Sequence, residues 1–182
     1  MKIVKLRKTD KNLVFQAAGL LVEGFRELSP EAWPDMRSAK AEVRGCLDPG
    51  RICLGMVDDS GVLLGWIGAI STYSGNAWEL HPLVVRKEFQ HKGIGSKLLK
   101  ALESAARQKG GSTIFLGADD ETGRTTLSGK NLYKDLFKKI ERIRNLRKHP
   151  YEFYQKNGYM ITGVIPDANG PGKPDILMAK KF

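Results

Sequence analysis

Two glycines stand where a predicted strand passes into a predicted helix. Gly93 and Gly95 follow the apolar run "LVV" and open an amphipathic pattern over residues 94–109. The first amides of a helix have no internal hydrogen-bond partners, and the helix dipole is positive at that end. Because glycine lacks a Cβ, a phosphate can approach those amides closely. The pair predicts a phosphate-binding loop, and a tight turn with close helix–sheet packing is the structural alternative.

A carboxylate and an imidazole precede this loop on one face of the same strand. Strand alternation over residues 77–85 places Glu79, His81, Leu83 and Val85 on that face. Glu79 stands among apolar residues, and partial desolvation would make it a stronger general base. A glutamate at a solvated strand end is the alternative for Glu79. His81 could relay a proton or line the site, or its role could be structural.

The elements that must position these groups mix strands with helices. Strands are expected over residues 2–8, 77–85, 112–118, 160–165 and 175–180, with a hairpin over 51–71. Helices are expected over residues 10–25, 38–47, 94–109, 131–146 and 150–159, the last one short and stopped by Gly158. A strand–helix–strand unit therefore predicts a mixed α+β or α/β sheet with a crossover helix. Pro82 has no amide hydrogen, so its strand should separate locally from a neighbour.

Length and composition narrow the class of protein. The chain has 182 residues, 41% of them hydrophobic, which predicts a single domain over residues 1–182 with its own core. The net charge of +10 favours nucleic acid, a membrane surface or a phosphate-rich cofactor as partner. The N-terminus lacks the apolar stretch of a signal peptide, and no apolar run approaches the roughly 20 residues of a membrane helix. Cys46 and Cys53 have no metal-ligand spacing, so we expect reduced thiols in a cytoplasmic protein.

Two motifs together resemble those of a known superfamily. The run Gln90-His91-Lys92-Gly93-Ile94-Gly95 resembles the Gln/Arg-x-x-Gly-x-Gly/Ala signature of the GNAT superfamily of N-acetyltransferases. About 60 residues later, "PYEFYQKNGY" resembles the aromatic-rich second motif of that superfamily. The resemblance implies the GNAT fold, a mixed α/β architecture with a mostly antiparallel central sheet that is splayed at the coenzyme A site and flanked by helices. It also implies acetyl-CoA as co-substrate and no metal.

Further segments resemble those of one subfamily within this superfamily. The segments "WPDM", "WELHPLVV", "LGADD", "TTLS" and "KPDILMAK" are similar to those of the aminoglycoside 6′-N-acetyltransferases. By that resemblance Glu79 is the base, directly or through water, and the Leu83 amide donates to the oxyanion. Tyr154 is the candidate acid near the thiolate, because a phenol with its ordinary pKa of about 10 holds its proton at pH 7; a core aromatic cluster is the alternative. The implied coenzyme contacts are Leu83, Val84, Val85, Gln90, His91, Lys92, Gly93, Ile94, Gly95, Ser96 and Tyr154.

An aminoglycoside is a polycation, so a basic protein must carry a locally acidic pocket to bind it. Asp119 and Asp120 follow a strand at its C-terminal end, where ligands of α/β proteins commonly bind. An ordinary turn is the alternative for this pair, and Arg124 brings a positive charge nearby. The predicted substrate contacts are Trp33 and Tyr73 for the sugar rings, with Glu79, Asp119, Asp120 and Glu152 for the amines.

Three functions compete at this stage. The leading interpretation is an acetyl-CoA-dependent aminoglycoside N-acetyltransferase. One rival keeps the enzyme and changes the acceptor to a polyamine, a peptide amine or a lysine, and another is a non-catalytic module that binds coenzyme A or RNA. The basic run 138–150 is expected to be a solvated helix face, since it lacks interleaved aromatics. We expect no nucleic-acid or membrane partner, and the resemblance implies a homodimer.

Overall fold

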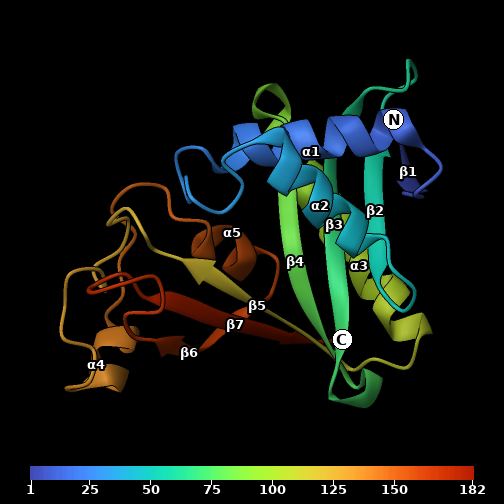
Figure 1. Ribbon diagram of the computed structural model, residues 1–182. Coiled ribbons are helices and arrows are strands. Elements are labelled where there is room, and N and C mark those ends of the chain that lie inside the picture. Colours follow the sequence, from blue (N-terminus) through green and yellow to red (C-terminus); the bar gives the residue numbers. More distant parts are fainter. The chain divides into compact units, whose positions relative to one another are not determined.

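The computed structural model describes the whole chain, Met1–Phe182, and divides it into two compact units. The first unit comprises Met1–Ile114 with Lys181–Phe182, and the second comprises Phe115–Lys180. Both units contain strands and helices (Figure 1). The single domain over residues 1–182 stays a prediction.

The first unit is built on four antiparallel strands in the order β1-β2-β3-β4. These are β1 (Lys2–Lys5), β2 (Ile52–Val57), β3 (Leu63–Thr72) and β4 (Ala77–Val85). The predicted hairpin is confirmed, and in its turn the Asp58 carboxylate accepts hydrogen bonds from the Ser60 and Val62 amides. Strand β1 is shorter than predicted, because the chain turns at Arg7 to enter the first helix.

Three helices of the first unit pack on these strands, as Figure 1 shows. They are α1 (Lys11–Phe25), α2 (Met36–Cys46) and α3 (Ile94–Gln108). Helices α1 and α2 share a buried apolar cluster with one face of the strands, whereas α3 packs on the opposite face. Trp66 joins the two layers of this cluster by donating its indole N–H to the Ala17 carbonyl at 3.1 Å. Helix α2 begins two residues earlier than predicted, because the Asp35 carboxylate caps the Arg37 and Ser38 amides.

Strand β4 carries a bulge at Pro82, the position where normal pairing was expected to stop. Ile67 of β3 is paired with Leu83 and Ala69 with Leu80, so His81 and Pro82 together face Gly68 alone. A Cβ at Gly68 would lie 2.5 Å from the His81 carbonyl oxygen, which is far inside van der Waals contact. Glycine at position 68 is therefore required for this bulge, and the predicted interruption of the strand is confirmed.

The second unit has three strands in the order β5-β7-β6 and two short helices. The elements are β5 (Thr113–Asp119), β6 (Met160–Ile165), β7 (Asp175–Lys181), α4 (Leu136–Glu141) and α5 (Tyr151–Lys156). Strands β6 and β7 are antiparallel. The predicted mixed architecture with mostly antiparallel pairing is confirmed, and the splay of the sheet at the coenzyme site stays a prediction. No helix of the chain has the length and apolar character needed to cross a membrane.

The helix predicted over residues 131–146 is wrong in extent, because α4 spans only Leu136–Glu141. Asp135 has a left-handed backbone with φ of 52°, which breaks the helix on its N-terminal side. Beyond α4 the chain pairs Asn145 with Thr125 in an isolated antiparallel bridge. This non-local pairing competes with helix propensity and prevails over it. The basic run that includes α4 is therefore not one continuous helix face.

Candidate functional site

The predicted coenzyme loop joins β4 to α3 through a 3₁₀ turn at Lys87–Phe89. Gly93 stands immediately before α3 with φ of 79°, a left-handed conformation that glycine adopts without steric cost. The Lys97 amide donates to the Gly93 carbonyl at 3.0 Å and closes the first helical turn. The amides of residues 94–96 precede that bond and have no partner within the helix. The loop therefore presents the free donors that a phosphate needs.

The last three side chains before Gly93 in this loop, those of Gln90, His91 and Lys92, are exposed. Gln90 donates its side-chain N–H to the Val85 carbonyl at 3.1 Å, which fastens the loop to the end of β4. The Lys92 ammonium lies 5.1 Å from the centre of the Phe89 ring. His91 has a left-handed backbone with φ of 58°. These contacts keep the loop compact and leave positive charge beside the start of α3.

We expect Gly95→Val to weaken acetyl-CoA binding about tenfold to a hundredfold, because a branched side chain blocks phosphate from the amides around it. Calorimetric titration of the folded variant with acetyl-CoA measures this. Gly19→Val is the matched control, since it places the same side chain in α1 where a Cβ meets no atom within 4 Å. An unchanged affinity in Gly95→Val would contradict the phosphate-loop assignment.

The accessible face of β4 carries the candidate catalytic groups. Burial alternates along the strand, with Trp78, Leu80, Pro82 and Val84 buried. The half-buried residues between them include Glu79, His81, Leu83 and Val85. The prediction that these four residues share one face is confirmed for Glu79 and His81, and His81 faces α2. It is wrong for Leu83 and Val85, because the two-residue bulge at His81 and Pro82 reverses the alternation. Leu83 is paired with Ile67 and Leu80 with Ala69, so Leu83 lies on the face of Leu80.

Two residues far apart in the sequence meet beside this face. The Trp33 ring lies 5.8 Å from the His81 ring, centre to centre, at an angle of 54°. Phe25 packs edge-on against Trp33 at 4.6 Å. The Nε2 atom of His81 lies 3.6 Å from a carboxylate oxygen of Glu42 in α2. Sequence reasoning missed Glu42. The only sign of it in the sequence is a single acidic residue beside the apolar stripe of α2.

Tyr73, the second aromatic residue predicted to contact a sugar ring, lies exposed in a 3₁₀ turn before β4.

In the second unit the two adjacent aspartates differ in environment. Asp120 is wholly buried, and its two oxygens accept hydrogen bonds from the Arg124 amide and from the amide and hydroxyl of Thr125. Asp119 is exposed, and one of its oxygens accepts a hydrogen bond of 2.6 Å from the Asn169 side chain. The geometry gives Asp120 the role of a loop anchor, whereas Asp119 offers a carboxylate toward solvent.

We expect Asp119→Asn to raise KM for a polycationic amine by no more than about fivefold, since exposed charges contribute about 0–1 kcal/mol and are screened by salt. Asp120→Asn should instead lower the melting temperature, because an amide cannot accept all the hydrogen bonds of the buried carboxylate. Steady-state kinetics at two salt concentrations and thermal unfolding separate the two effects. A KM for acetyl-CoA that rises as much as that for the amine would contradict a substrate contact at Asp119.

A buried histidine that sequence reasoning missed stabilises the same loop. The Nδ1 atom of His149 accepts from the Tyr151 amide at 3.2 Å. Its Nε2 atom therefore carries the proton and donates to the Asp119 carbonyl at 3.1 Å. Burial lowers the pKa of His149, so the ring is neutral at pH 7. Both nitrogens are engaged in structure, and His149 is not a free catalytic base.

Tyr154 lies in α5, the short helix that was predicted from the second motif. The rings of Phe153 and Tyr159 pack against it at 5.2 and 5.7 Å. Burial raises the pKa of Tyr154, so the phenol keeps its proton at neutral pH. That state suits a proton donor, and the aromatic packing equally suits a core residue. Glu152 is exposed on the same helix.

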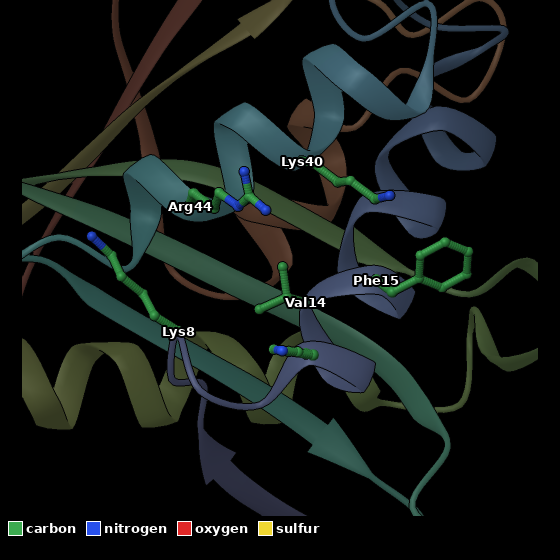
Figure 2. Close-up of a pocket in the computed structure, with 6 residues that line it drawn as sticks. Lys8, Val14, Phe15, Lys40 and Arg44 are labelled. Atoms are coloured by element: carbon green, nitrogen blue, oxygen red, sulfur yellow. The ribbon is translucent and has the colours of Figure 1, made fainter.

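A separate cavity of about 320 Å³ lies over α1 and α2 in the first unit. Its lining residues are Lys8, Lys11, Val14, Phe15, Lys40 and Arg44 (Figure 2). The Lys40 ammonium lies 5.0 Å from the centre of the exposed Phe15 ring. Four cations around one hollow would repel a polycation, so this cavity does not suit a polycationic amine.

Comparisons with known proteins agree with the motifs. The profile of the Acetyltransferase (GNAT) family matches residues 19–136. A crystal structure of an aminoglycoside 6′-N-acetyltransferase complexed with coenzyme A is 44% identical and covers 100% of this chain and 97% of that chain, with a TM-score of 0.91. The aminoglycoside 6′-N-acetyltransferase from Enterococcus faecium gives the same identity and coverage with a TM-score of 0.89. An aminoglycoside 6′-acetyltransferase type Ii is 38% identical, with 100% and 97% covered and a TM-score of 0.76. The curated proteins give no match.

Proposed function

Because the chain belongs to the GNAT family of acetyltransferases, we propose that it transfers the acetyl group of acetyl-CoA to the 6′-amine of aminoglycoside antibiotics and so confers resistance. The observation that carries this proposal is 44% identity over the full chain to an aminoglycoside 6′-N-acetyltransferase crystallised with coenzyme A. The phosphate-binding geometry before α3 and the carboxylate on the accessible face of β4 support it.

The reaction sets three demands that the chain's own groups can meet. The substrate ammonium must lose a proton before its nitrogen attacks, and half-buried Glu79 is the base. The oxyanion of the tetrahedral intermediate needs a donor, and the Leu83 amide supplies it. The leaving thiolate needs a proton, and the protonated phenol of Tyr154 gives one. The Leu83–Val85 segment and the loop at residues 90–96 hold the coenzyme.

Substrate recognition combines stacking with charge. Trp33 is held in place by Phe25 and His81, which makes it a rigid surface for a sugar ring. Glu79, Asp119 and Glu152 are the remaining acids for the amines, with Tyr73 as a second aromatic contact. Asp120 is buried, so it contributes to amine binding only indirectly, by anchoring the loop after β5.

Assembly and location follow as further parts of the proposal. The two free cysteines, Cys46 and Cys53, are both buried, which fits a reducing compartment such as the cytoplasm, where acetyl-CoA is supplied. We also propose a homodimer, which sedimentation equilibrium would test. A mass of one chain at micromolar concentration would contradict it.

The proposal is tested by free-thiol release from acetyl-CoA against a panel of amines. We expect release with kanamycin and neomycin, which carry a 6′-amine, and at least about tenfold lower kcat/KM with spermidine or a lysine peptide. An enzyme without added amine gives the background. Good turnover of spermidine or the peptide, with none of any aminoglycoside, would move the function to the alternative acceptor.

A further inference from the structure

Helix α2 contacts His81 at both its ring and its backbone. The Glu42 carboxylate lies 3.6 Å from Nε2 of the ring, within ion-pair range. The thiol of Cys46, one helical turn further along α2, lies 3.6 Å from the His81 carbonyl oxygen. Trp33 covers the ring at 5.8 Å. His81 is therefore contacted from outside its own strand by α2 and by Trp33.

Glu42 is itself held by a buried donor. The Cys46 sulfur lies 3.3 Å from the same Glu42 oxygen that faces His81. Burial, and then the nearby Glu42 charge, raise the pKa of the Cys46 thiol, so the sulfur keeps its proton and donates it. The side chain of Glu42 is only 25% exposed. Its carboxylate thus has a defined position before any substrate binds.

Gly68 of β3 provides the space for this arrangement. A Cβ at that position would lie 2.5 Å from the His81 carbonyl oxygen and 3.3 Å from the Cys46 sulfur. Any larger residue would displace the His81 backbone and crowd the Cys46 thiol. His81 in β4 is therefore in close contact with both β3 and α2. A histidine with a purely solvated side chain would not need these contacts.

We propose that Glu42 is a positioning residue that holds the Nε2 proton of His81 and leaves Nδ1 as the proton-accepting nitrogen. In a neutral imidazole one nitrogen donates and the other accepts, and the hydrogen bond at one nitrogen sets the state of the other. A carboxylate that faces Nε2 selects the tautomer with the proton there. The inference deepens the proposed acetyl transfer and rests on it.

The orientation of His81 matters because it shares an accessible face with Glu79. The Cα atoms of residues two apart on a strand are about 7 Å apart, so two side chains on the same face can approach closely enough for one water molecule to bridge them. The proton that leaves the substrate ammonium can pass from its N–H bond through Glu79 and water to Nδ1 of His81. The imidazolium that results faces the Glu42 carboxylate and returns to neutral by releasing that proton to solvent.

The tautomer can be measured directly, without substrate, by ¹⁵N NMR of histidine-labelled protein at alkaline pH. We expect His81 to carry its proton on Nε2 in the wild type and to populate both tautomers in Glu42→Gln, because the amide can either accept or donate. His149 is an internal reference, since the Tyr151 amide and the Asp119 carbonyl fix its tautomer. An identical His81 tautomer in both proteins would overturn the proposal.

A double-mutant cycle measures the functional coupling. We expect Glu42→Gln to lower kcat about tenfold with an unchanged KM for acetyl-CoA, and to cost nothing further in a His81→Gln background. Exposed Glu23 of α1 supplies the control, Glu23→Gln, which should change neither parameter. Losses that multiply in the double variant, or a Glu42→Gln that turns over like wild type, would overturn the proposal.

Two features keep this test separate from the proposed function. The cycle is run with whichever amine the wild type acetylates best, so failure with aminoglycosides alone leaves it intact. If Glu42→Gln does not fold, Glu42→Asp replaces it, because it keeps the charge and withdraws it from His81 by one methylene. The same tautomer mixing and the same non-additive loss are then expected, and their absence would overturn the proposal.

Discussion

Glu79→Gln should lower kcat by about 10²–10⁴-fold and leave acetyl-CoA affinity nearly unchanged. The amide has the shape of the carboxylate but cannot accept a proton from the ammonium. Because Glu79 is half-buried on the accessible face of β4, its replacement should not disturb the buried face of the strand. Steady-state kinetics with each substrate varied, together with calorimetry for acetyl-CoA, measure the two quantities.

The pH dependence gives a second measure of the same variant. The pH–rate profile of the wild type should fall toward acid as the base is protonated, and the variant should lose that acidic limb. Exposed Glu141 of α4 supplies the control, Glu141→Gln, which should keep both the rate and the profile. Wild-type turnover across the pH range would show that Glu79 is not the base. A rise in KM alone would assign Glu79 a purely electrostatic contact with the cationic substrate.

Local patterns in the sequence predicted the parts of the site that local structure builds. The alternation that places Glu79 and His81 on one face needs only the period of a strand, and the observed burial follows it. The turn before α3 needs a residue that tolerates a left-handed backbone, and Gly93 supplies it. Pro82 marked the bulge because the missing donor is a property of that residue alone.

Contacts between distant segments were beyond these patterns. Whether Asp119 or Asp120 faces inward depends on the position of the Arg124 and Thr125 amides, which the loop sets. The part of the predicted helix beyond α4 is lost to pairing with residues about 20 positions earlier in the chain.

Glu42 is a residue of the candidate site whose contact could not be predicted from a local pattern. Its spacing in α2 marks only a partly buried polar position beside an apolar stripe. Its meeting with His81 depends on how α2 packs over β3 and β4, with Gly68 leaving the space. Glu42 and His81 are 39 positions apart in the sequence. The pattern of residues within one helix does not reveal a contact over that separation.

Paromomycin should be turned over with a kcat/KM about 10³-fold or more below that of kanamycin. Paromomycin has a hydroxyl at the 6′ position, and a hydroxyl has a far higher pKa than an ammonium, so a glutamate cannot deprotonate it usefully. Its other amines lie several ångströms from the place where the 6′ group meets the thioester, and proximity accounts for orders of magnitude in rate. Thiol-release kinetics with both antibiotics measure the ratio.

Competition distinguishes poor chemistry from poor binding in that comparison. Paromomycin should inhibit acetylation of kanamycin, because most of its ring system and its remaining amines still fit the same contacts. Neomycin, which has the 6′-amine on a related ring system, is the matched control and should be a good substrate. A paromomycin that neither reacts nor inhibits would mean that the 6′ group is needed for binding and not only for attack.

The site of acetylation on kanamycin tests the central claim most directly. Mass spectrometry of the purified product should show one added acetyl group, and two-dimensional NMR should place it on the 6′ nitrogen alone. A single product follows if the pocket holds one amine against Glu79 and the thioester. A mixture of acetylated nitrogens, or a single product modified at another amine, would contradict 6′ specificity.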